Sequence, residues 1–215
     1  MKLYDAAWAP SPRRVRMFLA EKGIEVPREA IDLRSGEHLS DAYLRINPRG
    51  AVPALILDDA DGNGGEILCE SAAICRYFEA LHPRPALFGT TPIEIGRIES
   101  WTRRIEGDGY AAVVYVLRNT APHFRDHAIP NAGLPLPQIA ELAARGARMW
   151  EAFVDGLDAR LAASEWVAGD TYSFADITAL VTIDFARAAK LAVPEGLASL
   201  HRWHAAASTR PSAHA

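Results

Sequence analysis

The segment Asn47–Pro53 reads N-P-R-G-A-V-P and places a proline where an apolar strand begins. Because proline has no N–H to donate to a sheet, a proline at that position needs a specific reason. A cis Val52-Pro53 peptide bond is one, since it would leave the N–H and C=O of Val52 free to pair with an extended peptide ligand. A trans proline in an edge turn is the alternative. The local sequence leaves both open.

A second pair of candidate residues, Glu70 and Ser71, lies where an apolar strand meets a helix. Ser71 is expected to cap that helix. The start of a helix also offers a hydroxyl and unpaired backbone N–H groups, which suit a carboxylate, and Glu70 could receive an ammonium group. A helix cap without a ligand is the alternative interpretation.

The elements that must position these residues alternate between strand and helix over the first 81 residues. Strands are expected at 2–4, 25–33, 52–57 and 66–68. A helix capped by Ser11, with Pro12 at its first position, is expected to end at Gly23, and further helices are expected at 40–46 and from Ser71 to Leu81. The order predicts a mixed four-stranded sheet, with the first two strands parallel and the last two antiparallel.

The remainder of the chain is predicted to be helical. Residues 82–91 carry two prolines and a glycine, with a third proline at Pro92, and are expected to form a linker. Long helices are expected at 95–119 and 139–161. A capping box of Ser173 and Asp176 is expected to begin a helix that is apolar on most sides and therefore buried. A last helix is expected before a loose tail that begins at Pro211. The fold class is thus an α/β domain joined to an all-α domain.

Composition excludes several classes of protein. The 215 residues carry a net charge of −4, so neither nucleic acid nor an anionic membrane is an expected partner. No membrane span and no secretory signal are visible, which favours a cytoplasmic location. Cys69 and Cys75 are expected to be reduced and buried. The basic run of Arg13, Arg14 and Arg16 is expected to form a solvated helix face. Neither a metal-binding nor a nucleotide-binding motif is present in the sequence.

Five segments together resemble the glutathione S-transferase superfamily, in particular its theta-like bacterial and fungal branch. They are KLY, SPRRVRMFLAEKGI, GEHLSDAYLRINPRGAVPAL, ILCESAAICRYFEALHP and VAGDTYSFADITAL, in the family's order. The resemblance implies a thioredoxin-like glutathione-binding domain at 1–81, a linker at 82–91 and a helical domain at 92–215 that forms the electrophile site.

The resemblance also implies roles for single residues. Val52, before a cis Pro53, would pair through its main chain with the cysteinyl unit of glutathione. Glu70 and Ser71 would hold the ammonium and the carboxylate of the γ-glutamyl end. His38 matches a position that reaches the glycyl carboxylate, or it is a solvated loop histidine.

The group that activates the thiol is left open. Ser11 could donate its hydroxyl to the thiolate, or it is only a cap, in which case the helix dipole, backbone N–H groups or a bound water would stabilise the anion. Related serine enzymes place the serine at the position of Ala9. Tyr4 is less favoured, because strand alternation turns it to the opposite face.

The expected activity is conjugation of the glutathione thiolate to a small hydrophobic electrophile, by a homodimer. Candidate electrophile contacts are Trp8, Tyr110, Tyr115, Arg118 and Phe124. A glutathione-dependent peroxidase or thiol–disulfide reductase is one alternative, and a non-catalytic binding or regulatory module on the same fold is another.

Overall fold

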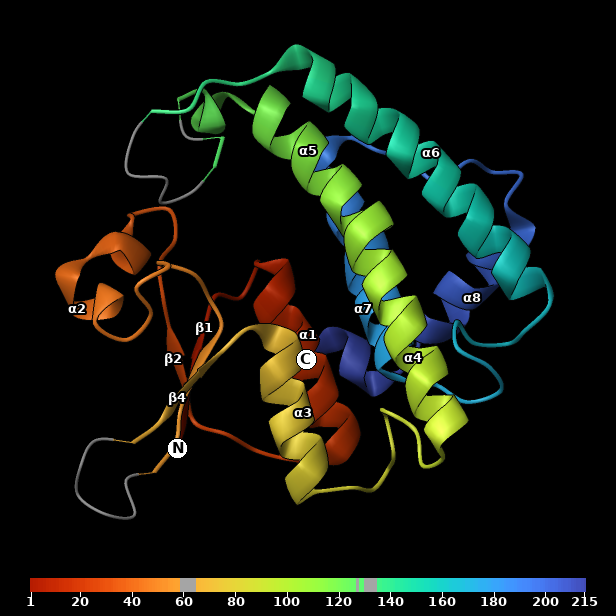
Figure 1. The fold of residues 1–215 in the computed structure, drawn as a ribbon, viewed down its shortest axis with the longest axis horizontal. Helices are drawn as coiled ribbons and strands as arrows, with labels where there is room; N and C mark the ends of the chain where they lie inside the picture. Colours follow the sequence, from red (N-terminus) through yellow and green to blue (C-terminus); the bar gives the residue numbers. More distant parts are fainter. Residues whose placement is uncertain (59–64, 127, 130–134) are drawn as a thin grey trace. The chain divides into compact units, whose positions relative to one another are not determined.

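The computed structural model describes residues 1–58, 65–126, 128–129 and 135–215 (Figure 1). The chain forms two compact units, Met1–Pro85 with His214–Ala215, and Ala86–Ala213. The division falls inside the segment 82–91 that the sequence predicts to be a linker, while the last two residues lie with the first unit.

The first unit is built on a four-stranded sheet of order β2-β1-β3-β4. β1 pairs with β2 in parallel and with β3 antiparallel, and β3 pairs antiparallel with β4, so the predicted mixed sheet is confirmed. The strands are β1 (Lys2–Asp5), β2 (Arg28–Ala30), β3 (Ala54–Ile56) and β4 (Ile67–Cys69). β2 is shorter than the predicted 25–33, because it pairs only with the short β1.

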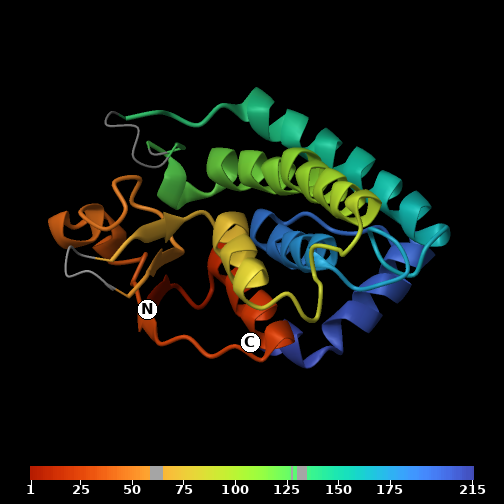
Figure 2. The ribbon, with the colours of Figure 1, turned by 60° about the horizontal axis from the view of Figure 1, so that its bottom comes forward.

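Two helices, α1 (Pro10–Lys22) and α3 (Ser71–Leu81), lie side by side in the first unit (Figures 1 and 2). α1 ends at Gly23, which adopts the left-handed conformation with φ 64°. Lys22 ties the ends of the two helices together, since its Nζ contacts Glu79 at 2.5 Å and donates to the carbonyl of His82 at 2.7 Å.

A separate small core lies under the short helix α2 (Asp41–Leu44), which Ser40 caps, and beside the 3-10 helix Glu37–Leu39. Its buried members are Tyr4, Ile31, Tyr43 and Ala54. Tyr4 and Tyr43 meet edge to face with ring centroids 5.7 Å apart. Leu3, the neighbour of Tyr4 in β1, is fully buried and points to the other face of the strand.

The second unit is a helical bundle. α4 (Pro92–Arg104) runs through a π-helical segment (Ile105–Tyr110) into α5 (Ala111–Thr120), and α6 (Ala140–Ala162) packs along α5 (Figure 2). α7 (Phe174–Phe185) is buried along most of its length and contacts α4 and α8 (Ala198–Ser208). Short 3-10 helices follow at Pro122–Phe124, Ala186–Ala189 and Pro211–His214.

The start of α7 carries the predicted capping box. Asp176 Oδ2 accepts hydrogen bonds from Ser173 N and Oγ, both at 3.0 Å. Its Oδ1 accepts from Val167 N and from Trp203 Nε1, both at 2.9 Å. The fully buried Asp176 therefore joins the loop before α7 to α8.

Four predictions about local structure are wrong. Ala9 is the N-cap of α1 and Glu70 is the N-cap of α3, so Ser11 and Ser71 lie inside their helices. The tail is ordered as a 3-10 helix in which Ser212 and Ala213 are buried. The basic run is not a solvated face, since Arg14 and Arg16 are 6% and 7% exposed.

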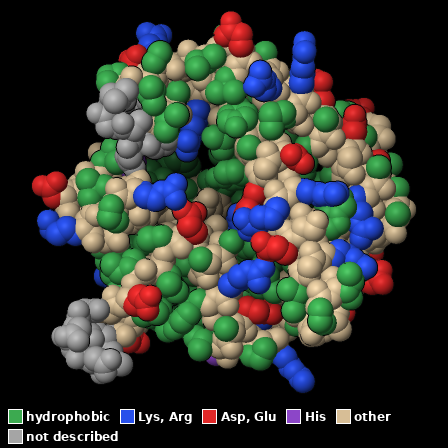
Figure 3. Space-filling model, in the orientation of Figure 1, with side chains coloured by type: hydrophobic (Ala, Val, Ile, Leu, Met, Phe, Trp, Pro, Cys, Tyr) green, Lys and Arg blue, Asp and Glu red, His purple; other side chains and the backbone are tan. Residues whose placement is uncertain are grey.

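The surface of the described residues carries both signs of charge. In Figure 3, Lys and Arg side chains alternate with Asp and Glu side chains over the visible face. No helix among the described residues is long and apolar enough to cross a bilayer. Cys69 and Cys75 are both free thiols, as expected, although only Cys75 is fully buried.

Candidate functional site

The Val52-Pro53 peptide bond is cis, which resolves the alternative left open by the sequence. The segment before it is held firmly, since the Ala51 carbonyl accepts hydrogen bonds from Tyr43 Oη and Asn47 Nδ2, both at 2.7 Å. The ladder of β3 begins only at Ala54. Val52 therefore lies outside the paired part of the strand.

The register of the sheet brings Val52 near the start of α3. Ala54 is the partner of Cys69, so the residue before Pro53 and the residues after Cys69 lie at the same end of these two strands. The main chain of Val52, Glu70 and Ser71 is thus gathered in one place. All three belong to the first unit.

The N-terminus of α3 has the properties of an anion site. Ile74 N donates to Glu70 O at 3.0 Å, so the preceding N–H groups, from Ser71 to Ala73, have no acceptor within the helix. Ser71 is 5% exposed, and no acidic residue lies in the first turn. A carboxylate bound here would meet backbone donors and the positive end of the helix dipole.

Glu70 occupies an unusual backbone conformation, with φ 70° and ψ 121°. Such a conformation is disfavoured for a residue with a Cβ and is typical of functional sites. Its exposed carboxylate pairs with Arg49, with 2.7 Å between Oε1 and Nη1. Arg49 was not among the residues predicted for the site, although it lies in the N-P-R-G motif.

The N-terminus of α1 is poor in backbone donors. Pro10 and Pro12 have no N–H, and Arg13 N donates to Ala9 O at 3.2 Å. The first turn contains no acidic residue, and Ser11, which is half-buried, has the remaining N–H and the hydroxyl. An anion at this helix end would therefore meet backbone and hydroxyl donors mainly at Ser11.

His38 lies in the 3-10 helix Glu37–Leu39. Its Nδ1 is buried and has no hydrogen-bond partner among the described residues. Burial lowers the pKa of His38, so the imidazole is neutral at neutral pH. An unpartnered buried ring nitrogen is the kind of group that a ligand satisfies.

Comparison with known proteins gives the family. Residues 8–81 match the N-terminal domain model of glutathione S-transferase, and residues 137–211 match its C-terminal domain model. The chain belongs to the glutathione S-transferase family. It is 36% identical to glutathione S-transferase 2 of Saccharomyces cerevisiae, over 99% of this chain and 87% of that protein.

Solved glutathione S-transferase structures have the same fold. The crystal structure of Gtt2 from Saccharomyces cerevisiae superposes with a TM-score of 0.86 at 34% identity, covering 99% of this chain and 98% of the other. That of a class Gtt2 enzyme from Vibrio parahaemolyticus gives 0.82 at 34% identity, covering 99% and 95%. The protein is a glutathione transferase, and its first unit has the thioredoxin-like fold.

Tyr4, the less favoured candidate for activating the thiol, lies in the small core with Ile31, Tyr43 and Ala54. Its ring is 6% exposed, packs on Tyr43, and has the ammonium of Lys2 4.8 Å from its centroid. The ring therefore belongs to the core under α2.

The candidate electrophile contacts are divided between the units. Trp8 is 59% exposed in the first unit, with the guanidinium of Arg34 5.9 Å from its ring centroid. In the second unit, Tyr110 stacks on Phe185 with centroids 5.6 Å apart. The remaining candidates are Tyr115, which lies against Gly146 of α6, Phe124, whose ring meets that of His123, and Arg118, which is partly buried in α5.

The sequence predicts no metal ligands. Over 1–58, 65–126, 128–129 and 135–215, the structure brings together no group of three or more His, Cys, Asp or Glu side chains that could hold a metal ion.

Proposed function

We propose that glutathione binds to the first unit, along the main chain of Val52 and at the N-terminus of α3, and that its thiolate forms at the start of α1. The thiolate then attacks a small hydrophobic electrophile. The observation that carries this proposal is the register of β3 and β4, which gathers Val52, Glu70 and Ser71 at one end of the sheet.

Each part of glutathione has a matching group in this arrangement. The γ-glutamyl carboxylate would accept from Ser71 and the first-turn N–H groups of α3, while its ammonium group would meet Glu70. The exposed Arg49–Glu70 pair is no obstacle, because exposed ion pairs contribute only about 0–1 kcal/mol. His38 would donate a ring N–H to the glycyl carboxylate, and Val52 would pair with the cysteinyl unit.

Activation of the thiol is assigned to Ser11. A free thiol has a pKa of about 8.5, and lowering it to about 6.5 needs about 2.7 kcal/mol of preferential stabilisation of the anion. One hydroxyl donor and one N–H at a helix N-terminus are of that magnitude together. In the chemical step the sulfur lone pair forms the carbon–sulfur bond, and a leaving group such as chloride departs with the electrons of the bond that breaks.

The cysteines of the chain support conjugation over reduction by a protein thiol. Burial raises the pKa of Cys69 and of Cys75, so neither is ionised at neutral pH. The positions at the start of α1 that could hold a nucleophilic cysteine are Ala9 and Ser11. A protein-based disulfide exchange at that helix therefore has no nucleophile.

We also propose a cytoplasmic homodimer that acts in detoxification. The family relationship supports these assignments, and so do large apolar side chains that are exposed in this chain, namely Leu81, Ile93 and Ile95 at 52%, 67% and 40%. Light scattering after size exclusion is expected to give about twice the mass of the 23.4 kDa chain.

The test of the binding site is thermal unfolding with and without glutathione. At about 100 times its dissociation constant the tripeptide adds about 2.7 kcal/mol, and the unfolding midpoint should rise by about 5–10 °C. The dipeptide Cys-Gly, which lacks the γ-glutamyl group, should give a much smaller rise. An equal rise with both would overturn the assignment of α3, and no rise at millimolar glutathione would leave only the non-catalytic module.

Variants test whether glutathione is held at the start of α3 or is attracted only by the net charge of the protein. Glu70→Gln and Ser71→Ala should each reduce the rise given by glutathione. Glu66→Gln removes the same charge from an exposed position before β4 and serves as the control. If Glu66→Gln reduces the rise as much as Glu70→Gln does, the effect is one of net charge and not of the site.

A further inference from the structure

Arg118 of α5 is a cation that has no counter-ion among the described residues. Its side chain is partly buried, and its guanidinium has neither an ion pair nor a hydrogen bond to any described residue. Its backbone carbonyl accepts a hydrogen bond from Gln138 Nε2 at 3.0 Å. The residues of the second unit outside the description, 127 and 130–134, include no Asp or Glu, so they supply no carboxylate.

Other arginines of the same unit have partners. Arg103 pairs with Glu99 at 3.0 Å and Glu106 at 2.7 Å. Arg160 donates to a backbone carbonyl at 2.8 Å, as does Arg202. Arg118 differs from all three.

The state of Arg118 is unfavourable in the protein alone. Burial of an unpaired charge is costly, because the group loses water without gaining a counter-charge. In agreement with this, burial lowers the pKa of Arg118, and Tyr110 is the titratable side chain of the described residues whose charge opposes that effect. An anion that reached the exposed part of the side chain would remove the penalty.

The surroundings of Arg118 define what kind of anion suits it. Tyr110 lies in the π-helical segment just before α5, and its ring is stacked on Phe185 at an interplanar angle of 27°. Tyr110 is thus the aromatic side chain that interacts electrostatically with the Arg118 guanidinium. A planar guanidinium binds a carboxylate through two parallel hydrogen bonds, and an aromatic surface packs against an aromatic or apolar body.

We propose that Arg118 binds the carboxylate of the electrophile, so that the preferred substrates are aromatic or apolar electrophiles that carry one carboxylate. This inference rests on the proposed function, because it concerns the second substrate of the conjugation. Tyr110 contributes the neighbouring aromatic surface.

The test compares two electrophiles that differ only in charge, 4-chloro-3-nitrobenzoate and 4-chloro-3-nitrobenzamide. In both, the glutathione sulfur forms a bond to the ring carbon and chloride leaves with the electrons of the carbon–chlorine bond. Rates without enzyme correct for their intrinsic reactivity. The corrected kcat/KM should be at least about tenfold higher for the benzoate, as for one charge-assisted contact.

Variants assign this preference to the side chain. Arg118→Gln should remove the preference for the benzoate through a higher KM, and Arg118→Lys should retain part of it, since lysine keeps the charge but not the two-point geometry. Arg148→Gln removes the same charge from an exposed position on α6 and should leave the ratio unchanged. Should Arg118→Gln fail to fold, 4-phenylbutanoate should still inhibit the native enzyme about tenfold better than 4-phenylbutanamide does.

The outcomes separate this inference from the proposed function. Conjugation of both electrophiles with equal corrected rates would overturn the role of Arg118 and leave the transferase activity intact. A rise in the KM for glutathione in Arg118→Gln, with the ratio of the electrophiles unchanged, would assign the side chain to a carboxylate of glutathione and also overturn the inference. No conjugation of either electrophile, together with no stabilisation by glutathione, would be the failure of the proposed function itself.

Discussion

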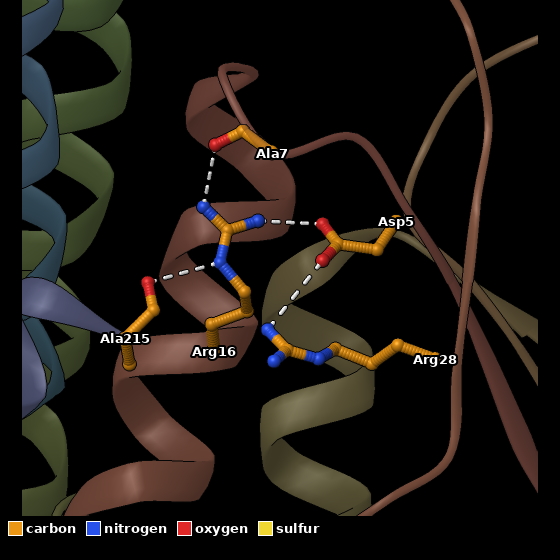
Figure 4. Close-up of polar contacts among 5 residues, drawn as sticks. All are labelled: Asp5, Ala7, Arg16, Arg28 and Ala215. Carbon is orange, nitrogen blue, oxygen red and sulfur yellow. Dashed lines mark hydrogen bonds and ion pairs between the residues drawn. The ribbon is translucent and has the colours of Figure 1, made fainter.

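The guanidinium of Arg16 and the carboxylate of Asp5 form a buried ion pair, with 2.5 Å between Nη1 and Oδ1 (Figure 4). Arg16 also donates from Nη2 to the Ala7 carbonyl at 2.8 Å and from Nε to the Ala215 carbonyl at 3.1 Å. One side chain of α1 therefore holds the end of β1, the loop that leads to Ser11, and residue 215.

Removing Arg16 should destabilise the protein strongly. Arg16→Met leaves Asp5 as a buried carboxylate whose remaining partner, Arg28, is 3.7 Å away, and such a loss costs about 3–5 kcal/mol of the free energy of unfolding. Urea denaturation measures this change. Arg13→Met, on the same helix but only half-buried, is the control and should cost less than about 1 kcal/mol. If the two variants lost the same free energy of unfolding, the buried ion pair would contribute no more to stability than an ordinary half-buried arginine does.

The capping carboxylate Asp176 should give the stability a defined pH dependence. Burial raises the pKa of Asp176 to about 6 in spite of its hydrogen bonds, against an ordinary value of 3.8. The folded state thus holds this proton more tightly than the unfolded state does. The stabilisation is complete below the ordinary pKa and is lost as the pH rises through about 6, by about 3 kcal/mol in all.

Asp176→Asn isolates this effect, because asparagine does not titrate. The free energy of unfolding of the native protein minus that of the variant, from urea denaturation, should fall between pH 4.5 and pH 7.5. A difference that rises over this range would mean that the donors from Val167, Ser173 and Trp203 keep the carboxylate ionised in the folded state.

The sequence was sufficient for the features that local chemistry determines. The mixed sheet with its parallel and antiparallel pairs, the capping box of Ser173 and Asp176, and the end of α1 at Gly23 follow from hydrophobic patterns and from residues with narrow conformational preferences. The start of α1 was misplaced because Pro10 and Pro12 both suit a first turn, and a serine near a proline does not decide between them.

Features that depend on distant residues could not be read from the sequence. Arg16 looks like a surface residue in the run RRVR, and only the fold brings Asp5 and residue 215 to it. Arg49 is likewise twenty-one positions from Glu70. The cis bond before Pro53 was one of two alternatives, because the proline limits the geometry without selecting it.

Ser11→Ala should lower the rate of conjugation at least about tenfold, because the variant removes the hydroxyl donor from a helix start where two prolines already remove backbone donors. The cause should be a higher pKa of the bound glutathione thiol. The ultraviolet absorbance of the thiolate, measured against pH in the binary complex, gives that pKa directly. If it is the same in Ser11→Ala as in the native enzyme, Ser11 is only a structural part of α1, and a water or the helix dipole activates the thiol.

Two glycines of the π-helical segment should respond in opposite ways to the same substitution. A Cβ at Gly109 would lie 2.5 Å from Cε1 of the Phe153 ring, whereas nothing lies within 4 Å of a Cβ at Gly107. Gly109→Ala should therefore lower the free energy of unfolding by about 1–3 kcal/mol through overpacking, and Gly107→Ala should leave it unchanged or raise it by up to about 1 kcal/mol. Thermal and urea unfolding measure both. A second substitution, Phe153→Leu, should lessen the penalty of Gly109→Ala. If Gly109→Ala were as well tolerated as Gly107→Ala, the close approach of α6 to this segment would not be what requires a glycine there.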